Sequence, residues 1–459
     1  MKYIDEKRIF DLIEKTGTAS EKEAEDILKK SLSLTRLSLE DTSKLLSVSD
    51  PRLLKRLFET AKEVKQRIYG KRIVLFAPLY ISNYCVNNCL YCAFRSDNKS
   101  IKRVHLSSDE IKEQTRILLK NGQKRILVVA GEAPPPRKKN EDYYVEAIEA
   151  VYSARFKDHK IKRVNINCAP LPVEGFRKLK AAGIGTFQLF QETYHQSTYK
   201  MVHPRGPKSD PDNRLDAIDR AFKAGIDDIG IGLLYGLYDY RYETLAMLSH
   251  VEHMEKSYRV GPHTISVPRI EPAEGVDFRS VYEVSDLDFK KVVSVIRLSV
   301  PYTGMILSTR ETPRLRDELL ELGISQMSAA SRTSPGGYEE SSFESGAQFV
   351  LGDNRSLDQV IGALIGHEFI PSFCAACYRS SRTGEVFMSL AKPGTIKGKC
   401  TMNALITLKE YLDDFASESV KHKGYKLIKE AERALPDQEK SALAKFFEQI
   451  DNGLRDRYV

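Results

Sequence analysis

The stretch ISNYCVNNCLYCAFR, residues 81–95, decides how the rest of the chain is interpreted. Its cysteines, Cys85, Cys89 and Cys92, follow a Cys-x3-Cys-x2-Cys spacing. Three thiolates this close together can hold three irons of a cubane cluster, which leaves the fourth iron without a protein ligand. The alternative is a zinc site, but such sites usually take four ligands from two paired units. Because the trio lacks a nearby fourth ligand, the spacing favours a cluster with one open metal position.

The composition is that of an ordinary globular protein. The chain has 459 residues, of which 41% are hydrophobic and 29% charged, and its net charge of +8 comes from basic residues mixed with acidic ones. We therefore expect no nucleic-acid partner. No apolar run approaches the roughly 18 residues of a membrane span, and the acidic residues near the N-terminus are unlike a signal peptide. We expect a cytoplasmic protein with no membrane partner.

The seven cysteines are an odd number, and they form two tight groups plus Cys168. This distribution is unlike the disulfide framework of a secreted protein and is typical of metal ligation in a reducing compartment. Cys168 lies in a predicted strand, so we interpret it as a buried structural thiol.

From residue 72 onward, short apolar runs alternate with stretches long enough for a helix. Eight such runs occur, at residues 73–80, 126–131, 164–169, 186–190, 229–234, 264–270, 305–310 and 326–330. Alternation of strands and helices predicts an α/β fold with a parallel sheet. Eight units favour a closed (β/α)8 barrel, and an open doubly wound sheet remains the alternative.

The regions on either side of these runs differ from them in pattern. Residues 1–70 have apolar residues at helical spacing, and Asp50 or Ser49 before Pro51 is a good helix N-cap. Residues 335–362 are rich in Gly, Ser and Asp and suggest a linker or surface excursion, whereas 358–370 and 401–416 favour helices. We predict a helical N-terminal extension at 1–70, a barrel at 71–345 and a mostly helical C-terminal domain at 346–459.

The predicted strands carry more polar residues than a barrel interior usually holds. They are Asn165, Asn167, Gln188, Ser266, Arg269, Ser308, Arg310 and Ser328. A buried polar group without a partner costs about 1–3 kcal/mol, so this number of them predicts a hydrated or ligand-filled interior. The planar guanidinium of Arg310, at the end of the seventh run, suits a substrate carboxylate. We expect Arg269, Ser308 and Arg310 to bind substrate, with Arg310 also catalytic.

A second cysteine group lies near the end of the chain. Cys374, Cys377 and Cys400 have a Cys-x2-Cys-x22-Cys spacing, again with no evident fourth ligand. A zinc ribbon that lacks one ligand, or a purely structural cluster, is the alternative. Ligation by cysteine alone favours a second cluster with an open iron.

The first trio, with Tyr91 in the aromatic position before its last cysteine, is the signature of the radical S-adenosylmethionine (SAM) family. Together the two trios resemble the radical SAM tyrosine lyases that help assemble the active site of FeFe-hydrogenase. The resemblance covers most of the chain and includes residues 82–89, 191–195, 203–204, 227–232, 236–241 and 261–266. It implies the same (β/α)8 barrel and two 4Fe-4S clusters.

At the first cluster, the resemblance implies catalytic roles for Cys85, Cys89 and Cys92. SAM would chelate the open iron, and an electron from a donor such as ferredoxin or flavodoxin would cleave it to a 5′-deoxyadenosyl radical. The residues expected to contact SAM are Tyr91, Gly131, Glu132, Glu192, Gly230 and Gly232. The segment Ala130-Gly131-Glu132 has one glycine fewer than the usual Gly-Gly-Glu motif. Tight strand–helix packing explains Gly230 and Gly232 about as well as contact with adenosine.

At the second cluster, the resemblance implies an additional iron held by free L-cysteine and a histidine, for which His263 is the candidate. L-Tyrosine would be split to p-cresol and dehydroglycine, and the fragment converted to carbon monoxide and cyanide. The iron product would pass to other hydrogenase maturation proteins. One rival is the tyrosine lyase of thiazole (thiamine) biosynthesis, which lacks the second trio. The other is a non-catalytic protein in which both trios bind metal only to stabilise the fold.

Overall fold

Eight parallel strands close into a barrel in this computed structural model, which describes residues 1–134, 136, 138–339 and 346–459. Strand β2 pairs with both β3 and β1, so the sheet returns on itself and is not open. Each of these eight strands overlaps one of the eight predicted runs, which confirms the (β/α)8 barrel. The strands are β1 Arg72–Ser82, β2 Arg125–Ala130, β3 Arg163–Asn167, β4 Phe187–Glu192, β5 Ile229–Leu233, β6 Thr264–Ser266, β7 Gly304–Leu307 and β8 Gln326–Ser328.

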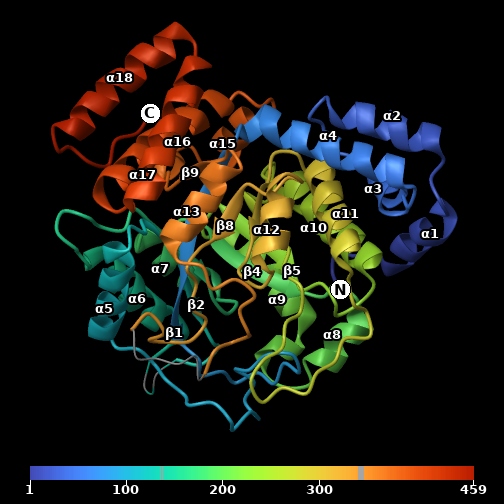
Figure 1. Ribbon diagram of the computed structural model, residues 1–459. Helices are drawn as coiled ribbons and strands as arrows, with labels where there is room; N and C mark the ends of the chain where they lie inside the picture. The colour runs from blue at the N-terminus through green and yellow to red at the C-terminus, as the bar shows by residue number, and fades with distance from the viewer. Residues whose placement is uncertain (135, 137, 340–345) are drawn as a thin grey trace.

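Helices between the strands cover the outside of the barrel (Figure 1). Their starts follow from local chemistry: Ser107 and Glu110 form a capping box, and Asp210 caps a helix whose first residue is Pro211. The helices are α5 Ser108–Lys120, α6 Asn140–Ser153, α7 Val173–Ala181, α8 Gln196–Val202, α9 Pro211–Lys223, α10 Tyr240–Tyr258, α11 Asp286–Ser299 and α12 Pro313–Leu320, with a 3-10 turn η1 at Pro207–Ser209.

The N-terminal helices pack on one side of the barrel, against α10 and α11 (Figure 1). They are α1 Glu6–Thr16, α2 Glu21–Ser31, α3 Leu39–Leu46 and α4 Pro51–Tyr69. The predicted cap at Asp50 is confirmed, because its carboxylate accepts from the backbone N–H groups of Arg52 and Leu53. The buried residues of α4 recur at helical spacing, as Leu57, Ala61, Val64 and Ile68 do.

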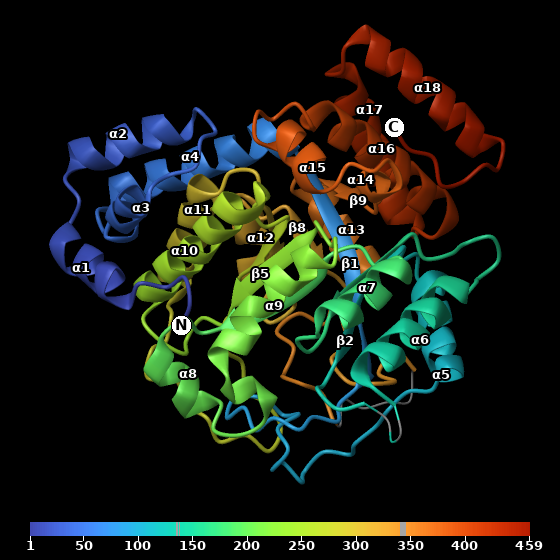
Figure 2. The ribbon, with the colours of Figure 1, turned by 180° about the vertical axis from the view of Figure 1, so that it is seen from behind.

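The C-terminal part joins the barrel through a ninth strand that the sequence did not predict. β9, Ile370–Ser372, pairs in parallel with the start of β1 in the register Arg72↔Ile370 and Val74↔Ser372. The helix expected over 358–370 ends instead at Gly366. Figure 2 shows β9 and the C-terminal helices beside the beginning of β1. They are α13 Leu357–Gly366, α14 Ala376–Arg379, α15 Gly384–Ala391, α16 Lys397–Asp414, α17 Glu418–Arg433 and α18 Asp437–Asp451.

The segment interpreted as a linker or surface excursion is largely folded into the protein. Its residues 340–345, with the predicted domain boundary at 345, lie outside the described residues, so the three-domain division stays a prediction. Beyond them, Phe349, Leu351 and Asp353 are buried, and the backbone N–H of Val350 donates to the carbonyl of Pro272. No helix in the described part of the chain is long and apolar enough to cross a membrane.

Candidate active site

The first cysteine trio lines a cavity of about 200 Å³ at the end of the barrel where the strands finish. The loop that carries it follows β1 and is tied to two neighbouring loops. The backbone N–H of Val86 donates to the Glu132 carbonyl (3.1 Å), and that of Asn88 donates to the Arg205 carbonyl (3.0 Å). The guanidinium of Arg103 also donates to four backbone carbonyls within residues 83–98. The loop is therefore held in place by the fold.

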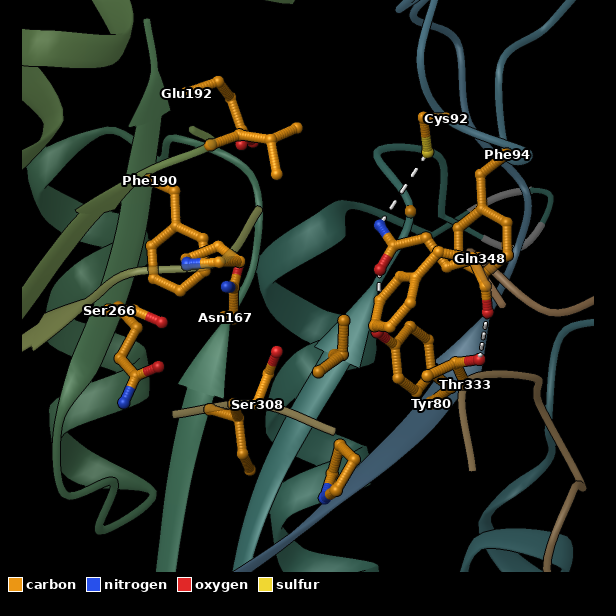
Figure 3. Close-up of a pocket in the computed structure, with 18 of the residues that line it drawn as sticks. Tyr80, Cys92, Phe94, Asn167, Phe190, Glu192, Ser266, Ser308, Thr333 and Gln348 are labelled. Atoms are coloured by element: carbon orange, nitrogen blue, oxygen red, sulfur yellow. Dashed lines mark hydrogen bonds between the residues drawn. The ribbon is translucent and has the colours of Figure 1, made fainter. Parts of the chain in front are cut away.

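The thiols have the surroundings that cluster ligands need. The side-chain amide of Asn87 donates to Cys85 Sγ (3.6 Å), and that of Gln348 donates to Cys92 Sγ (3.8 Å; Figure 3). Burial raises the pKa of Cys89 to about 12 and also raises that of Cys92. Both thiols are therefore neutral until a metal displaces their protons. Across the described ranges, no three His, Cys, Asp or Glu side chains converge closely enough for a single metal ion.

Three of the residues expected at SAM lie at the wall of this cavity, namely Tyr91, Gly131 and Glu132. The hydroxyl of Tyr91 lies 2.8 Å from His203 Nε2, and the Glu132 carboxylate accepts from the Asn87 amide at 2.6 Å. A Cβ at Gly131 would overlap the backbone carbonyl of Tyr84. The remaining glycine of the Ala-Gly-Glu segment is therefore sterically required beside the cysteine loop.

A Gly131→Ala variant should bind the first cluster poorly, because the methyl group must push away the backbone that carries Cys85. We expect lower iron content and weaker SAM binding, measured by iron assay and equilibrium dialysis after anaerobic reconstitution. Gly366→Ala is the matched control, since a Cβ there meets nothing within 4 Å. Equal iron content in the two variants would contradict this account of Gly131.

Glu192, a further residue expected at SAM, lines the cavity in a strained backbone conformation. Its φ is +71°, at a point where the β4–β5 register shifts. Its carboxylate pairs with Lys208 Nζ (2.7 Å) and lies 3.7 Å from Arg214. Burial alone would raise the pKa of Glu192, but the two cations outweigh it and lower that pKa. The cavity therefore contains a fixed carboxylate on the side opposite Cys92 (Figure 3).

The prediction that Gly230 and Gly232 contact SAM is not supported by their position. Neither is among the described residues that line the cavity. A Cβ on Gly230 would crowd Thr264 Oγ1, and one on Gly232 would lie 2.8 Å from the backbone oxygen of Ser266. These glycines therefore allow β6 to pack closely against β5. The close contact is between two strands and not between a strand and a helix.

The polar interior predicted from the strands is present in large part. Figure 3 shows Asn167, Ser266 and Ser308 on one side of the cavity. Gln188, Arg310 and Ser328 also line it. Asn165 does not, because its side-chain oxygen accepts from the backbone N–H of Thr186 (3.0 Å) and from Arg163 Nε (3.1 Å). The interior is therefore polar where it meets the cavity.

The two arginines predicted to bind substrate differ in position. The guanidinium carbon of Arg310 lies 3.4 Å from the Phe349 ring centroid. Among the described residues, no side-chain hydrogen bond or ion pair engages it. Arg269, by contrast, is bound in a bidentate pair by Glu311 and lies 3.0 Å from Asp286. Arg269 is not among the described residues that line the cavity, because β6 ends at Ser266 and its alternation does not extend to residue 269. Substrate binding by Arg269 therefore stays a prediction that its position does not favour.

Three residues of the cavity wall gave no signal in the sequence. They are Thr333, which follows β8, and Gln348 and Phe349, which come from the segment that resembled a linker. The hydroxyl of Tyr80 donates to Gln348 Oε1 (2.7 Å), which orients the Gln348 amide toward Cys92. Cys168 is buried as expected, and it too lies at this wall.

The second trio lines a separate cavity, of about 40 Å³, at the opposite end of the barrel. Cys374 follows β9, Cys377 lies in α14, and Cys400 lies in the first turn of α16. Burial raises the pKa of Cys377 to about 12 and also raises that of Cys400. The backbone N–H of Ala376 donates to Cys374 Sγ (3.4 Å). This arrangement also suits metal-bound thiolates.

His263 lines the same cavity, as the sequence predicted. It comes directly before β6, and its ring stacks on Phe387 with centroids 4.1 Å apart. Burial lowers its pKa, so the ring is neutral at neutral pH and a nitrogen lone pair is available. The structure therefore brings three thiols and one imidazole to one cavity.

The two cavities follow each other along the same strands. Val74 of β1 lines the second cavity and Phe76 the first, and Gln326 and Ser328 of β8 have the same relation. Residues two apart in a strand point to the same side, so both cavities belong to the barrel interior. Along β1 and β8 their walls are two residues apart, whereas the two cysteine trios lie at opposite ends of the barrel.

Two family models match the chain: the Radical SAM superfamily at residues 79–250 and the Biotin and Thiamin Synthesis associated domain at 266–369. The chain is 33% identical to the 2-iminoacetate synthase of Salmonella typhimurium, over 75% of this chain and 88% of that protein. A crystal structure of HydG, a maturase of the FeFe-hydrogenase, is 46% identical over all of both chains, with a TM-score of 0.96. HydG from Carboxydothermus hydrogenoformans is 42% identical over 96% of this chain and 97% of that one, with a TM-score of 0.84.

Proposed function

The chain belongs to the radical SAM superfamily, in the branch that contains HydG, and from this premise we propose that it is a radical SAM tyrosine lyase. It would cleave L-tyrosine to p-cresol and dehydroglycine at the first site. The fragment would yield carbon monoxide and cyanide at the second site, for an iron–carbonyl–cyanide precursor that carries cysteine. Membership of this family implies a 4Fe-4S cluster and SAM.

At the first site, Cys85, Cys89 and Cys92 would hold the cluster. When bound, the cluster and SAM supply a 5′-deoxyadenosyl radical after an electron arrives from a donor such as ferredoxin or flavodoxin. Tyr91, Gly131, Glu132 and Glu192 line the space beside the trio and would hold SAM. The unpaired guanidinium of Arg310 would bind the tyrosine carboxylate, with Ser308 beside it.

An Arg310→Lys variant should bind tyrosine at least about 10-fold more weakly, with SAM binding nearly unchanged. Lysine keeps the charge but cannot offer two parallel N–H donors to a carboxylate. The measurement is the tyrosine concentration dependence of p-cresol formation. Arg269→Lys is the control, since that side chain is already bound by Glu311. An unchanged tyrosine dependence in Arg310→Lys would show that another group anchors the substrate.

The observation that carries this proposal is that Cys374, Cys377, Cys400 and His263 all line one cavity. A lyase that stopped at p-cresol and dehydroglycine would have no use for this second set of ligands. The likeness to HydG extends over the whole chain, whereas the likeness to 2-iminoacetate synthase covers 75% of it. The trio would hold a second 4Fe-4S cluster, and His263 with free L-cysteine would hold an additional iron.

Product analysis with tyrosine, SAM and dithionite tests this function directly. Formation of p-cresol together with cyanide and iron-bound carbon monoxide is expected. The formation of p-cresol without either diatomic product would indicate a lyase of the thiazole-pathway type. The absence of p-cresol, cyanide and carbon monoxide, together with bound zinc, would indicate that the cysteine trios are structural metal sites. Other hydrogenase maturation proteins would receive the iron product.

A further inference from the structure

We propose that Asp228 is a positioning residue for the second site, a role that rests on the proposed function of His263 as an iron ligand. Asp228 would hold the Nδ1–H of His263, so that the Nε2 lone pair is presented to the cavity of the second trio. Arg163 would in turn hold Asp228. Neither residue lines that cavity, and the sequence analysis assigned a role to neither of them.

Asp228 is a buried carboxylate without a regular hydrogen bond. It lies one residue before β5 and is 2% exposed. Within the described part of the chain, neither of its oxygens has a hydrogen bond of good geometry. The cationic or potentially cationic groups paired with it are His263 Nδ1, at 3.3 Å, and Arg163, at 3.9 Å. Burial of a carboxylate is costly unless it is paired, so these two contacts account for its presence.

Arg163 is locked in place beside Asp228. Its Nε donates to Asn165 Oδ1 (3.1 Å), and its guanidinium carbon lies 2.9 Å from the Tyr378 ring centroid. A Cβ at Gly185 would overlap that guanidinium, so only glycine leaves the space it occupies. The positive charge that faces Asp228 is therefore fixed by packing on three sides.

The ring of His263 has little freedom as well. Its backbone N–H donates to the Ile229 carbonyl (2.8 Å), its carbonyl accepts from Gly304 (2.8 Å), and its ring stacks on Phe387. A neutral imidazole has one N–H and one lone pair, and an ionised carboxylate can only accept. Contact between Asp228 and Nδ1 therefore selects the tautomer with hydrogen on Nδ1. The lone pair is then on Nε2, the nitrogen left free for a metal.

An Asp228→Asn variant tests the role with almost no change in shape. An amide can donate to Nδ1, so it no longer selects the tautomer. Loss of an outer-shell partner typically weakens metal binding 10- to 100-fold, so we expect the additional iron to bind at least about 10-fold more weakly. Asp227→Asn is the matched control, because Asp227 is exposed and its carboxylate accepts from Thr383 Oγ1 (3.1 Å).

The experiment uses the full-length chain, reconstituted anaerobically and titrated with ferrous iron while electron paramagnetic resonance follows the second cluster. The formation of p-cresol reports that each variant is folded. Weak iron binding in Asp228→Asn, with normal binding in Asp227→Asn, is the expected result. If His263→Ala loses the iron while Asp228→Asn keeps wild-type affinity, the positioning role is wrong and the proposed ligand stands. If His263→Ala itself keeps wild-type affinity, the ligand assignment fails.

A second measurement does not depend on the folding of Asp228→Asn. The wild-type chain without clusters, labelled with 15N-histidine, reports the tautomer of His263, with His263→Ala used to assign its signal. We expect hydrogen on Nδ1 and a free lone pair on Nε2. The opposite tautomer would overturn the proposal by itself.

Discussion

Replacement of Cys89 with alanine is expected to abolish SAM cleavage completely. Cys89 is the most buried thiol of the first trio, at 6% exposure, and it lines the same cavity as Cys85 and Cys92. A cubane cannot keep three iron ligands when one thiolate is removed, and no other thiol of the trio can take its place. The measurement is 5′-deoxyadenosine formed from SAM and dithionite under strictly anaerobic conditions.

A matched control for this variant is Cys168→Ala. Cys168 is buried at the wall of the same cavity but does not belong to the trio. Its variant should therefore retain the iron of the first cluster, which shows that loss of a buried thiol in this cavity does not by itself remove the metal. Undiminished 5′-deoxyadenosine formation by Cys89→Ala would rule out radical SAM chemistry at this trio.

Replacement of Cys377 with alanine should leave p-cresol formation largely intact and abolish iron-bound carbon monoxide. The second trio lies at the start of the strands and the first beyond their ends. At about 3.3 Å per strand residue, the two mouths of such a barrel are on the order of 20 Å apart. One substrate cannot contact both clusters at this distance, so a small fragment must travel between them. Polar interior residues such as Gln188, Ser266 and Ser328 would line its path.

The measurement is p-cresol by chromatography alongside infrared detection of iron carbonyls. His263→Ala provides an intermediate case, since it should keep the second cubane and lose occupancy of the additional iron. A folded Cys377→Ala protein with its first cluster intact could instead lose p-cresol in proportion to carbonyl. That result would show that the two sites do not work separately.

Most of the fold could be predicted because its signals are local. Each strand is a short apolar run, and helix starts such as Asp50 before Pro51 satisfy the first backbone N–H groups with a neighbouring side chain. Each cysteine trio lies within a short stretch of chain, so the sequence could predict that its members line one cavity. His263 could be placed at the second cavity because it directly precedes a predicted strand.

The sequence was least informative where long-range contacts decide the structure. Arg269 lies beyond the last residue of β6, where period-two alternation no longer applies and Glu311 determines its direction. Gln348 and Phe349 belong to a segment of linker-like composition that is ordered by contacts with Thr333 and Pro272. Nothing local marks such residues as part of a cavity. Asp228 and Arg163 are likewise close only in the folded chain.

The pairing of β9 with β1 also bears on solubility. In the first part of β1, Arg72–Val74, only Val74 pairs with β8. All three residues pair with Ile370–Ser372 of β9. Without β9, these N–H and C=O groups would form an open sheet edge, flanked by the apolar residues of β1. Such edges recruit strands from other molecules and lead to aggregation. The C-terminal segment therefore protects the barrel against self-association, independently of any metal that it holds.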